Sequence, residues 1–336
     1  DLYNPDPNGA TGLTWFRSGA HTDTKTTTTS FYAFDTAHLT DALLLTGGIR
    51  FDRYDTDYLG HLPCTANNSQ PCNGAPVGTL TTLRLNSKDT LFNWKLGAVY
   101  KVGDVASIYA NYAVSQQPPG GATLELSPAA NSPNNPLYDP QKAKTFEVGS
   151  KWNLLDDALL LTMALYQTDV SNEVITENGV TFQGGDKRVK GIELSAVGKI
   201  TDDWSVSAGY TTMDATVTDG PNVANDRTRD LGYTPDSAFT AWTTYVLPFG
   251  LTVGGGVRYS GEMKRGTDGA VGTPNFVKSY TVWDAVVSYA LNDHLDLRLN
   301  AYNLFDKDYV AAINKSGYRY TPGAPRSVLL TLNLRF

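Results

Sequence analysis

The chain has 336 residues, a formal net charge of −7 and 41% hydrophobic residues, with 19 Tyr and 31 Gly. It contains no basic tract, which argues against nucleic-acid binding through phosphate neutralisation. No uninterrupted apolar stretch approaches the ~18 residues that a transmembrane helix requires. A closed sheet is the remaining way to satisfy every backbone polar group in lipid, and its alternating strands keep the mean hydropathy low.

The N-terminal segment, DLYNPDPNGA, has neither the basic start nor the apolar core of a signal peptide. We therefore expect that the chain has been processed or begins within a longer protein. Leu13 to Arg17 is a weak candidate for an extra strand. We assign residues 1–29 to an N-terminal segment and extracellular loop, and residues 30–336 to a transmembrane β-barrel.

Alternation of apolar and polar residues then recurs along the chain in segments of about ten residues. In residues 295–301, Leu295, Leu297, Leu299 and Ala301 face one way, while Asp296, Arg298 and Asn300 face the other. The same pattern predicts thirteen strands, beginning near residues 30, 43, 89, 105, 143, 158, 189, 204, 236, 251, 280, 295 and 326. Charged residues within them fall on the less apolar face: Arg50, Lys95, Glu147, Lys151, Glu193, Arg258, Arg298 and Arg335.

The connections alternate in length, which orients a barrel with short turns in the periplasm and long loops outside. Short turns are predicted at Leu39 to Ala42, Val102 to Asp104, Leu154 to Asp157, Thr201 to Asp203, Pro248 to Gly250 and Asn292 to His294. Long polar loops are predicted at residues 54–88, 116–140, 170–186, 216–233, 261–278 and 306–324. Aromatic residues on the apolar face beside the turns predict an interfacial girdle: Tyr100, Trp152, Trp204, Tyr245 and Tyr289. A soluble β-sandwich or propeller fits this alternation of connections poorly.

Cys64 and Cys72 lie close together in a polar stretch, which favours a small disulfide loop over a metal site. The four histidines, His21, His38, His61 and His294, show no pair with metal-ligand spacing. We therefore interpret them as solvated loop residues and predict no metal site.

The last strand places Val328, Leu330, Leu332, Leu334 and Phe336 on one face. Alternating apolar residues that lead to a terminal Phe resemble the signal recognised by the outer-membrane insertion machinery. The sequence therefore predicts that the final strand carries this signal.

Longer strings resemble the C-terminal barrel of TonB-dependent receptors, and most closely the catecholate-type ferric siderophore receptors. They are SFYAFDTAHL, LTGGIRFDRYDT, KTFEVGSKWNLLDDALLLTMALYQTDVSN, RVKGIELSAVGKITDDWSVSAGY, YTPDSAFTAWTTYVL, NAYNLFDKDYV and YRYTPGAPRSVLLTLNLRF. The resemblance implies a 22-stranded barrel around an N-terminal plug that carries a TonB-binding box. Neither plug nor box is recognisable here. About thirteen or fourteen strands remain, which would form a smaller closed barrel, pair with partner strands, or stay open in a fragment.

The resemblance also implies uptake of a ferric siderophore, with iron carried only as part of the complex and no resident cofactor. The partners it implies are the siderophore, TonB acting through the plug, outer-membrane lipid and lipopolysaccharide, and the insertion machinery. Gly191 and Gly198 lack side chains on one predicted strand, which permits a bend or close packing against something inside the lumen. In the family, that something is the plug.

A ferric catecholate is anionic and aromatic, so its site needs cations and aromatic rings on the loops. The candidates are Tyr54, Tyr58, Tyr138, Arg227, Arg229, Tyr233, Lys264, Arg265, Tyr318, Arg319 and Tyr320. A disulfide between Cys64 and Cys72 would restrain a long loop.

Two other functions remain open. A barrel without a plug would act as a passive porin. An outer-membrane phospholipase or protease would need a nucleophile beside a histidine at one rim, and neither His21 nor His61 has a recognisable nucleophile motif nearby.

Overall fold

The computed structural model describes residues 17–64, 72, 74–121, 123, 125–177, 180–267, 272–313 and 319–335. Residues 13–16 of the candidate extra strand, Tyr318 and Phe336 lie outside these ranges. Within the described part, no helix is long and apolar enough to cross a membrane.

One antiparallel sheet contains thirteen strands that pair in the order of the sequence. They are β1 (His21–His38), β2 (Leu43–Pro63), β3 (Leu80–Val102), β4 (Ala106–Gln117), β5 (Gln141–Leu154), β6 (Leu159–Glu177), β7 (Val180–Thr201), β8 (Trp204–Asp219), β9 (Ser237–Val246), β10 (Leu251–Ser260), β13 (Tyr280–Asn292), β14 (Leu295–Tyr302) and β17 (Ser327–Leu334). Each corresponds to one of the thirteen predicted strands, so the predicted fold class is confirmed.

Four short strands were not predicted, because two to four residues are too few to show alternation. β11 (Met263–Lys264) pairs with β12 (Phe276–Val277), and β15 (Val310–Ile313) pairs with β16 (Tyr320–Pro322). Both hairpins lie in connections that the sequence marks only as polar loops.

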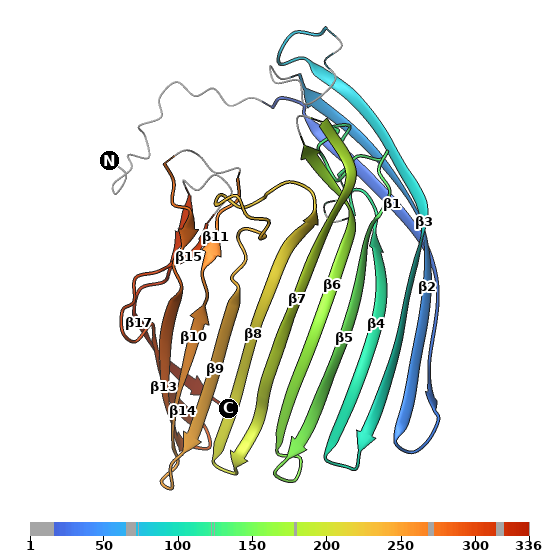
Figure 1. The fold of residues 1–336 in the computed structure, drawn as a ribbon. Coiled ribbons are helices and arrows are strands. Elements are labelled where there is room, and N and C mark those ends of the chain that lie inside the picture. Colours follow the sequence, from blue (N-terminus) through green and yellow to red (C-terminus); the bar gives the residue numbers. More distant parts are fainter. Residues whose placement is uncertain are drawn as a thin grey trace, which may run out of the picture. The chain divides into compact units, whose positions relative to one another are not determined.

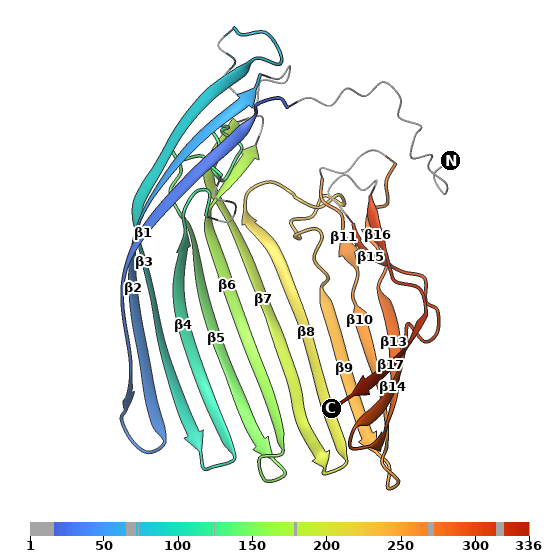
Figure 2. The same cartoon turned by 180° about the vertical axis from the view of Figure 1, so that it is seen from behind.

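The six short turns are confirmed where they were predicted. Strands β4 to β10 run side by side, with the short turns at one end and the long loops at the other (Figures 1 and 2). We call these two ends of the sheet the turn end and the loop end. The turn between β5 and β6 holds Leu155, Asp156 and Asp157 at positive φ (54° to 65°), a conformation in which Asp is several-fold enriched.

The chain divides into two compact units. The first comprises Asp1–Thr29, Asp52–Thr90 and Pro118–Asp139, and the second comprises Ser30–Phe51, Leu91–Gln117 and Pro140–Phe336. In the first unit, a small core forms where Leu126 packs on Tyr58 and Leu83.

In the second unit, the pairing register sorts side chains onto two faces, because directly paired residues share a face. Leu297 pairs with Tyr289 and with Leu332, whereas Arg298 pairs with Ser288 and with Thr331. The apolar and polar faces predicted from alternation are therefore confirmed.

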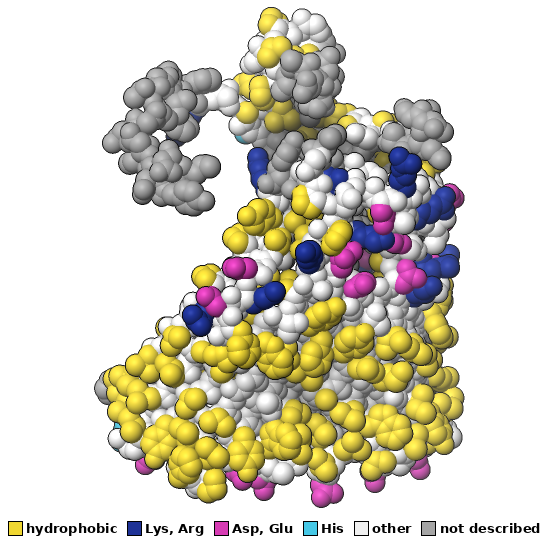
Figure 3. All heavy atoms as spheres, turned by 60° about the vertical axis from the view of Figure 1, so that its left-hand side comes forward, with side chains coloured by type: hydrophobic (Ala, Val, Ile, Leu, Met, Phe, Trp, Pro, Cys, Tyr) yellow, Lys and Arg dark blue, Asp and Glu magenta, His cyan; other side chains and the backbone are white. Residues whose placement is uncertain are grey.

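The apolar face is exposed although its side chains are large. Leu96 is 57% exposed, Ile108 47% and Leu299 44%. The face shown in Figure 3 carries a broad band of hydrophobic side chains, with acidic and basic side chains gathered above it. The predicted girdle residues lie on the apolar face near the turns, and Trp204 pairs directly with Tyr245. A sheet that turns such a band outward is suited to lipid.

The predicted boundaries were wrong at three places, because the strands continue beyond the apolar band. Residues 21–29, assigned to the N-terminal segment and loop, belong to β1. Residues 54–63 belong to β2 and residues 80–88 to β3, and the predicted loop at 170–186 is mostly strand. Ion pairs between Arg188 and Asp169 (2.6 Å) and between Lys187 and Glu173 (2.8 Å) link β6 and β7 there. Because these side chains are charged, the sequence predicted a polar loop where the structure has an ordered strand extension.

Three aromatic rings on the polar face cover glycines on the neighbouring strand. Tyr109 pairs with Gly149, Tyr166 with Gly191 and Trp242 with Gly256. A Cβ at Gly191 would meet the Tyr166 hydroxyl at 2.7 Å, so the glycine makes room for the ring. The Tyr166 ring and the backbone of Thr212 fill the space beside Gly191, and the backbone of Ala158 fills the space beside Gly198, which has a φ of 144°. Packing of these glycines against a separate domain stays a prediction.

Candidate functional site

The candidate ligand-binding residues divide between the two units. Tyr54, Tyr58 and Tyr138 belong to the first unit, and the others that the structure describes belong to the second. Tyr318 lies outside the described residues.

Tyr54 and Tyr58 were expected on a loop, and this placement was wrong. Both lie in β2, where they are 4% and 6% exposed. Alternate residues of this strand, from Asp52 to Gly60, are buried, because they face the interior of the first unit. Tyr54 shares a hydrogen bond with Ser87 (3.4 Å), and Tyr58 is covered by Leu126. Neither ring is available to stack on a ligand in this conformation.

Tyr138 lies in the connection between β4 and β5 and is half-buried. Its hydroxyl donates a hydrogen bond to the Ala130 carbonyl at 2.6 Å. In the same unit, Cys64 and Cys72 form a disulfide with a Cα–Cα distance of 5.3 Å, which confirms the predicted pairing.

The loop between β8 and β9, residues 220–236, is held by backbone contacts on two sides. The Val217 N–H donates to Arg229 O at 2.8 Å, which ties the loop to β8. The Tyr233 N–H donates to Lys264 O at 2.8 Å, which ties it to β11. A further bridge joins Ala224 and Gly266. The loop is therefore an ordered part of the second unit.

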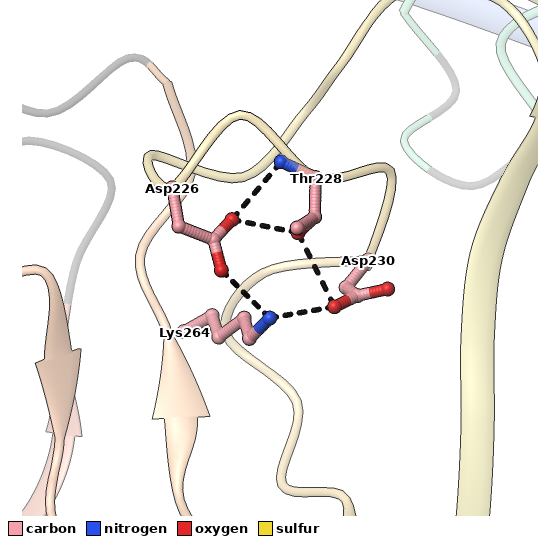
Figure 4. Close-up of polar contacts among 4 residues, drawn as sticks. All are labelled: Asp226, Thr228, Asp230 and Lys264. Carbon is pink, nitrogen blue, oxygen red and sulfur yellow. Dashed lines mark hydrogen bonds and ion pairs between the residues drawn. The ribbon is translucent and has the colours of Figure 1, made fainter.

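Lys264 locks this arrangement through its side chain (Figure 4). Its Nζ lies 2.7 Å from Asp226 Oδ2 and 2.6 Å from Asp230 Oδ2. The Thr228 hydroxyl donates to Asp226 at 2.6 Å and lies 3.2 Å from Asp230. We call these four residues the Lys264 latch.

Hydrogen bonds within the Lys264 latch shift the pKa values of Asp226 and Lys264. The hydrogen bond from Lys264, followed by those from Thr228, lowers the pKa of Asp226 to about 2. Hydrogen bonds to Asp226 and Asp230 raise the pKa of Lys264 above its ordinary value. Asp226 and Lys264 are therefore both charged at neutral pH.

Arg265 is also engaged in holding the loops together. It is only 4% exposed, and its guanidinium donates hydrogen bonds to Asn225 Oδ1 at 2.5 Å and to the Thr273 hydroxyl. The Arg265 N–H donates to Asn275 O at 2.8 Å. Lys264 and Arg265 therefore position the loops, Lys264 through two ion pairs and Arg265 through hydrogen bonds to neighbouring neutral groups.

Arg227 and Arg229 of the same loop are exposed. Arg227 has a positive φ of 65°, and Arg229 donates a hydrogen bond to the Thr218 carbonyl at 3.1 Å. Tyr233 is half-buried, also at positive φ (64°). The two arginines leave cationic surface at the loop end of the sheet.

Arg319 and Tyr320 lie in the last long connection, and both are exposed, Tyr320 by 62%. Tyr320 belongs to β16 and faces a cavity that also contains Tyr280 and Tyr309. The rings of Tyr280 and Tyr309 have centroids 4.3 Å apart. Of this aromatic group, the sequence candidates included only Tyr320. Tyr280 and Tyr309 were missed because their proximity depends on two separate hairpins.

Two histidines that are 40 positions apart in the sequence also meet. His21 and His61, both in the first unit, stack with ring centroids 4.5 Å apart. His61 Nδ1 lies 3.1 Å from the Thr82 hydroxyl. Sequence spacing cannot reveal this pair, because it forms across strands. Among the described residues, no group of three or more His, Cys, Asp or Glu is arranged to hold a metal ion.

Together, an outward apolar band, short turns and structured loops that expose Arg227, Arg229 and Tyr320 define a class of protein. The chain is part of an outer-membrane β-barrel. The family described as "TonB dependent receptor-like, beta-barrel" matches residues 1–304, and the chain belongs to that family.

Particular relatives are similar along most of the chain. It is 47% identical to the catecholate siderophore receptor Fiu of Escherichia coli K12 over 100% of its own length and 45% of that protein. It is 31% identical to a probable TonB-dependent siderophore receptor, PiuA, of Acinetobacter baumannii, over 94% of this chain and 41% of PiuA.

The solved structure of Fiu in its closed form superposes with a TM-score of 0.89, covering 96% of this chain and 46% of that chain. The chain thus spans less than half the length of the curated relatives it matches.

Proposed function

We propose that the full-length protein is an outer-membrane receptor that binds a ferric siderophore, of the catecholate type, and imports it with energy from TonB. The observation that carries this proposal is the 47% identity over the whole chain to a catecholate siderophore receptor, whose solved structure superposes with a TM-score of 0.89. The exposed arginines and Tyr320 at the loop end suit an anionic, aromatic ligand.

Iron enters this proposal only as cargo within the chelate, so the receptor needs no resident metal or cofactor. In a protein of the relatives' length, a plug and further strands would complete the barrel, and TonB would act on the plug. This chain would supply wall and capture loops. Its relatives are transport receptors, and we assign the protein no enzymatic role.

The apolar band would contact outer-membrane lipid, and the charged side chains above it would contact lipopolysaccharide. Lys144 aligns with Asp169 across the β5–β6 pair, Arg188 pairs with Asp169, and Lys190 lies 3.0 Å from Asp214. Three cations and two carboxylates leave one positive charge for phosphate groups. Less lipopolysaccharide should copurify with a Lys144→Gln/Lys190→Gln variant than with the wild-type protein. An unchanged amount would show that these lysines do not bind lipopolysaccharide.

Growth on a single iron source tests the receptor function. A strain that lacks its own catecholate receptors would express the full-length protein with ferric dihydroxybenzoate as the only iron. We expect growth that requires TonB, and no growth on a ferric hydroxamate. Growth that persists without TonB would favour the passive-porin alternative, which also predicts steady open-pore current in a planar bilayer.

A further inference from the structure

The hairpins β11–β12 and β15–β16 contribute to a cavity of about 710 Å³ in the second unit. Phe276 comes from β12, Tyr280 begins β13 and Tyr320 comes from β16. Tyr309 immediately precedes β15 and also lines the cavity. The volume lies within the ~300–1,000 Å³ range of sites that bind small molecules. Four aromatic side chains from separate elements therefore converge on one hollow.

The floor of this cavity is built in advance of any ligand. The rings of Tyr280 and Tyr309 are 4.3 Å apart and inclined by 33°. Tyr309 lies against Gly323, where any Cβ would collide with its ring. Tyr280 pairs with Ser260 in the continuous ladder between β10 and β13. The sheet therefore fixes the Tyr280 backbone, and the two rings lie against each other with Tyr309 packed on Gly323, so the floor is formed before binding.

The rim is aromatic and exposed. Tyr320 is 62% exposed and Phe276 is 43% exposed. These two rings lie on short hairpins at the loop end, away from the apolar band that faces lipid. Exposed aromatic groups beside a preformed cavity are typical of a surface that a ligand covers.

Charge around the cavity adds a second requirement. Lys278 and Lys307 line it and are exposed, and Asp308 lines it as well. The two lysines and one carboxylate leave a net charge of +1 beside the rings. A neutral aromatic molecule would make no use of the lysines, and a small inorganic anion would make no use of the rings.

We propose that this cavity binds one catechol ring of an anionic iron chelate. Tyr320 and Phe276 contact the ring above the Tyr280–Tyr309 floor, and Lys278 and Lys307 attract its negatively charged oxygen atoms. This assignment rests on the proposed receptor function and adds the place in the chain where the aromatic group is recognised. The Lys264 latch and Arg265 lie outside this role, since their charges hold the neighbouring loop.

A binding titration of the full-length receptor in detergent tests the assignment. The probe is the iron(III) complex of 2,3-dihydroxybenzoate, followed by quenching of intrinsic fluorescence. We expect Tyr320→Ala and the double variant Lys278→Gln/Lys307→Gln each to bind about tenfold more weakly, from loss of stacking or of charge attraction. Tyr320→Phe keeps the ring and should bind like the wild type.

Two matched controls separate the cavity from general surface effects. Phe305→Ala removes a 70% exposed ring from the same connection, and Lys199→Gln removes an exposed lysine from the turn end of β7. Both should leave the affinity unchanged. Wild-type affinity in Tyr320→Ala and in the lysine double variant would overturn the cavity assignment. A wild-type receptor that binds a ferric hydroxamate and not the dihydroxybenzoate complex would instead overturn the proposed catecholate function.

Discussion

The strand wall and the loop-end hairpins of the second unit keep their shape by different means. In the wall, a continuous backbone ladder carries the structure, and side chains need only alternate between an apolar and a polar face, as Leu297 and Arg298 do. In the hairpins, individual side chains hold the backbone: the Lys264 latch and the buried Arg265 join segments that share few ladder bonds. The wall therefore tolerates exchange within a face, whereas the loop end depends on particular residues.

The largest effect is expected from placing a charge on the wrong face of the wall. Leu194 pairs with Met163 and Tyr210 on the apolar face, at mid-height of the band. Leu194→Lys should lower the free energy of unfolding by ~2–4 kcal/mol, because the ammonium group must enter lipid. Denaturant titration of the full-length protein folded into lipid vesicles measures it.

The matched control introduces a lysine on the opposite, polar face of the sheet. Ser207 is exposed on the polar face, where Ser207→Lys should change the stability little. If both variants unfold at the same denaturant concentration, the apolar face does not contact lipid.

The next largest effect concerns the rings that cover glycines on the polar face. Gly191→Val would place a Cβ against the Thr212 carbonyl oxygen and 2.7 Å from the Tyr166 hydroxyl, with an expected loss of about 1–3 kcal/mol from overpacking. The same unfolding experiment measures the loss. Tyr166→Ala in the Gly191→Val background should restore part of the lost stability. If the losses of the two single variants simply add in the double variant, Gly191 and Tyr166 are not in contact.

A smaller and local effect is expected from opening the latch. Lys264→Met removes the cation between Asp226 and Asp230 and leaves two carboxylates facing each other. Because these groups are partly exposed, we expect a local loss of only about 1 kcal/mol, with faster proteolysis of residues 220–236 and an unchanged unfolding midpoint. Lys144→Met, on the wall, should leave the proteolysis rate unchanged. Equal cleavage of both variants would show that the latch does not hold the loop.

The smallest effect is the acid response of the same latch. The pKa of Asp226 is lowered to about 2 from an ordinary 3.8, so its stabilising contribution is present above about pH 4 and is lost as the pH falls through about 2. Hydrogen exchange of the loop amides should therefore accelerate between these pH values in the wild type. Asp226→Asn should lack this acceleration, and an identical acid response in both proteins would contradict the assignment.

Several features were predictable from the sequence, for a physical reason that is local. Side chains of a strand alternate with a period of two, so the thirteen strands, their faces and the short turns follow from neighbouring residues alone. The disulfide also follows, because Cys64 and Cys72 are separated by only eight positions. The family resemblance rests on strings within this same pattern.

Other features depended on tertiary structure, because they arise where distant segments meet. The extensions of β2 and β6 are rich in polar residues, so the sequence predicted loops there. In the structure, ion pairs to β7 keep the β6 extension ordered, and Leu126 covers the β2 extension. Among the predicted ligand-binding residues, only the packing separates the buried Tyr54 and Tyr58 from the exposed Tyr320. The cavity beside Tyr320 needs two hairpins to bring Phe276, Tyr280 and Tyr309 together. Alternation along a strand does not predict contacts between such distant segments.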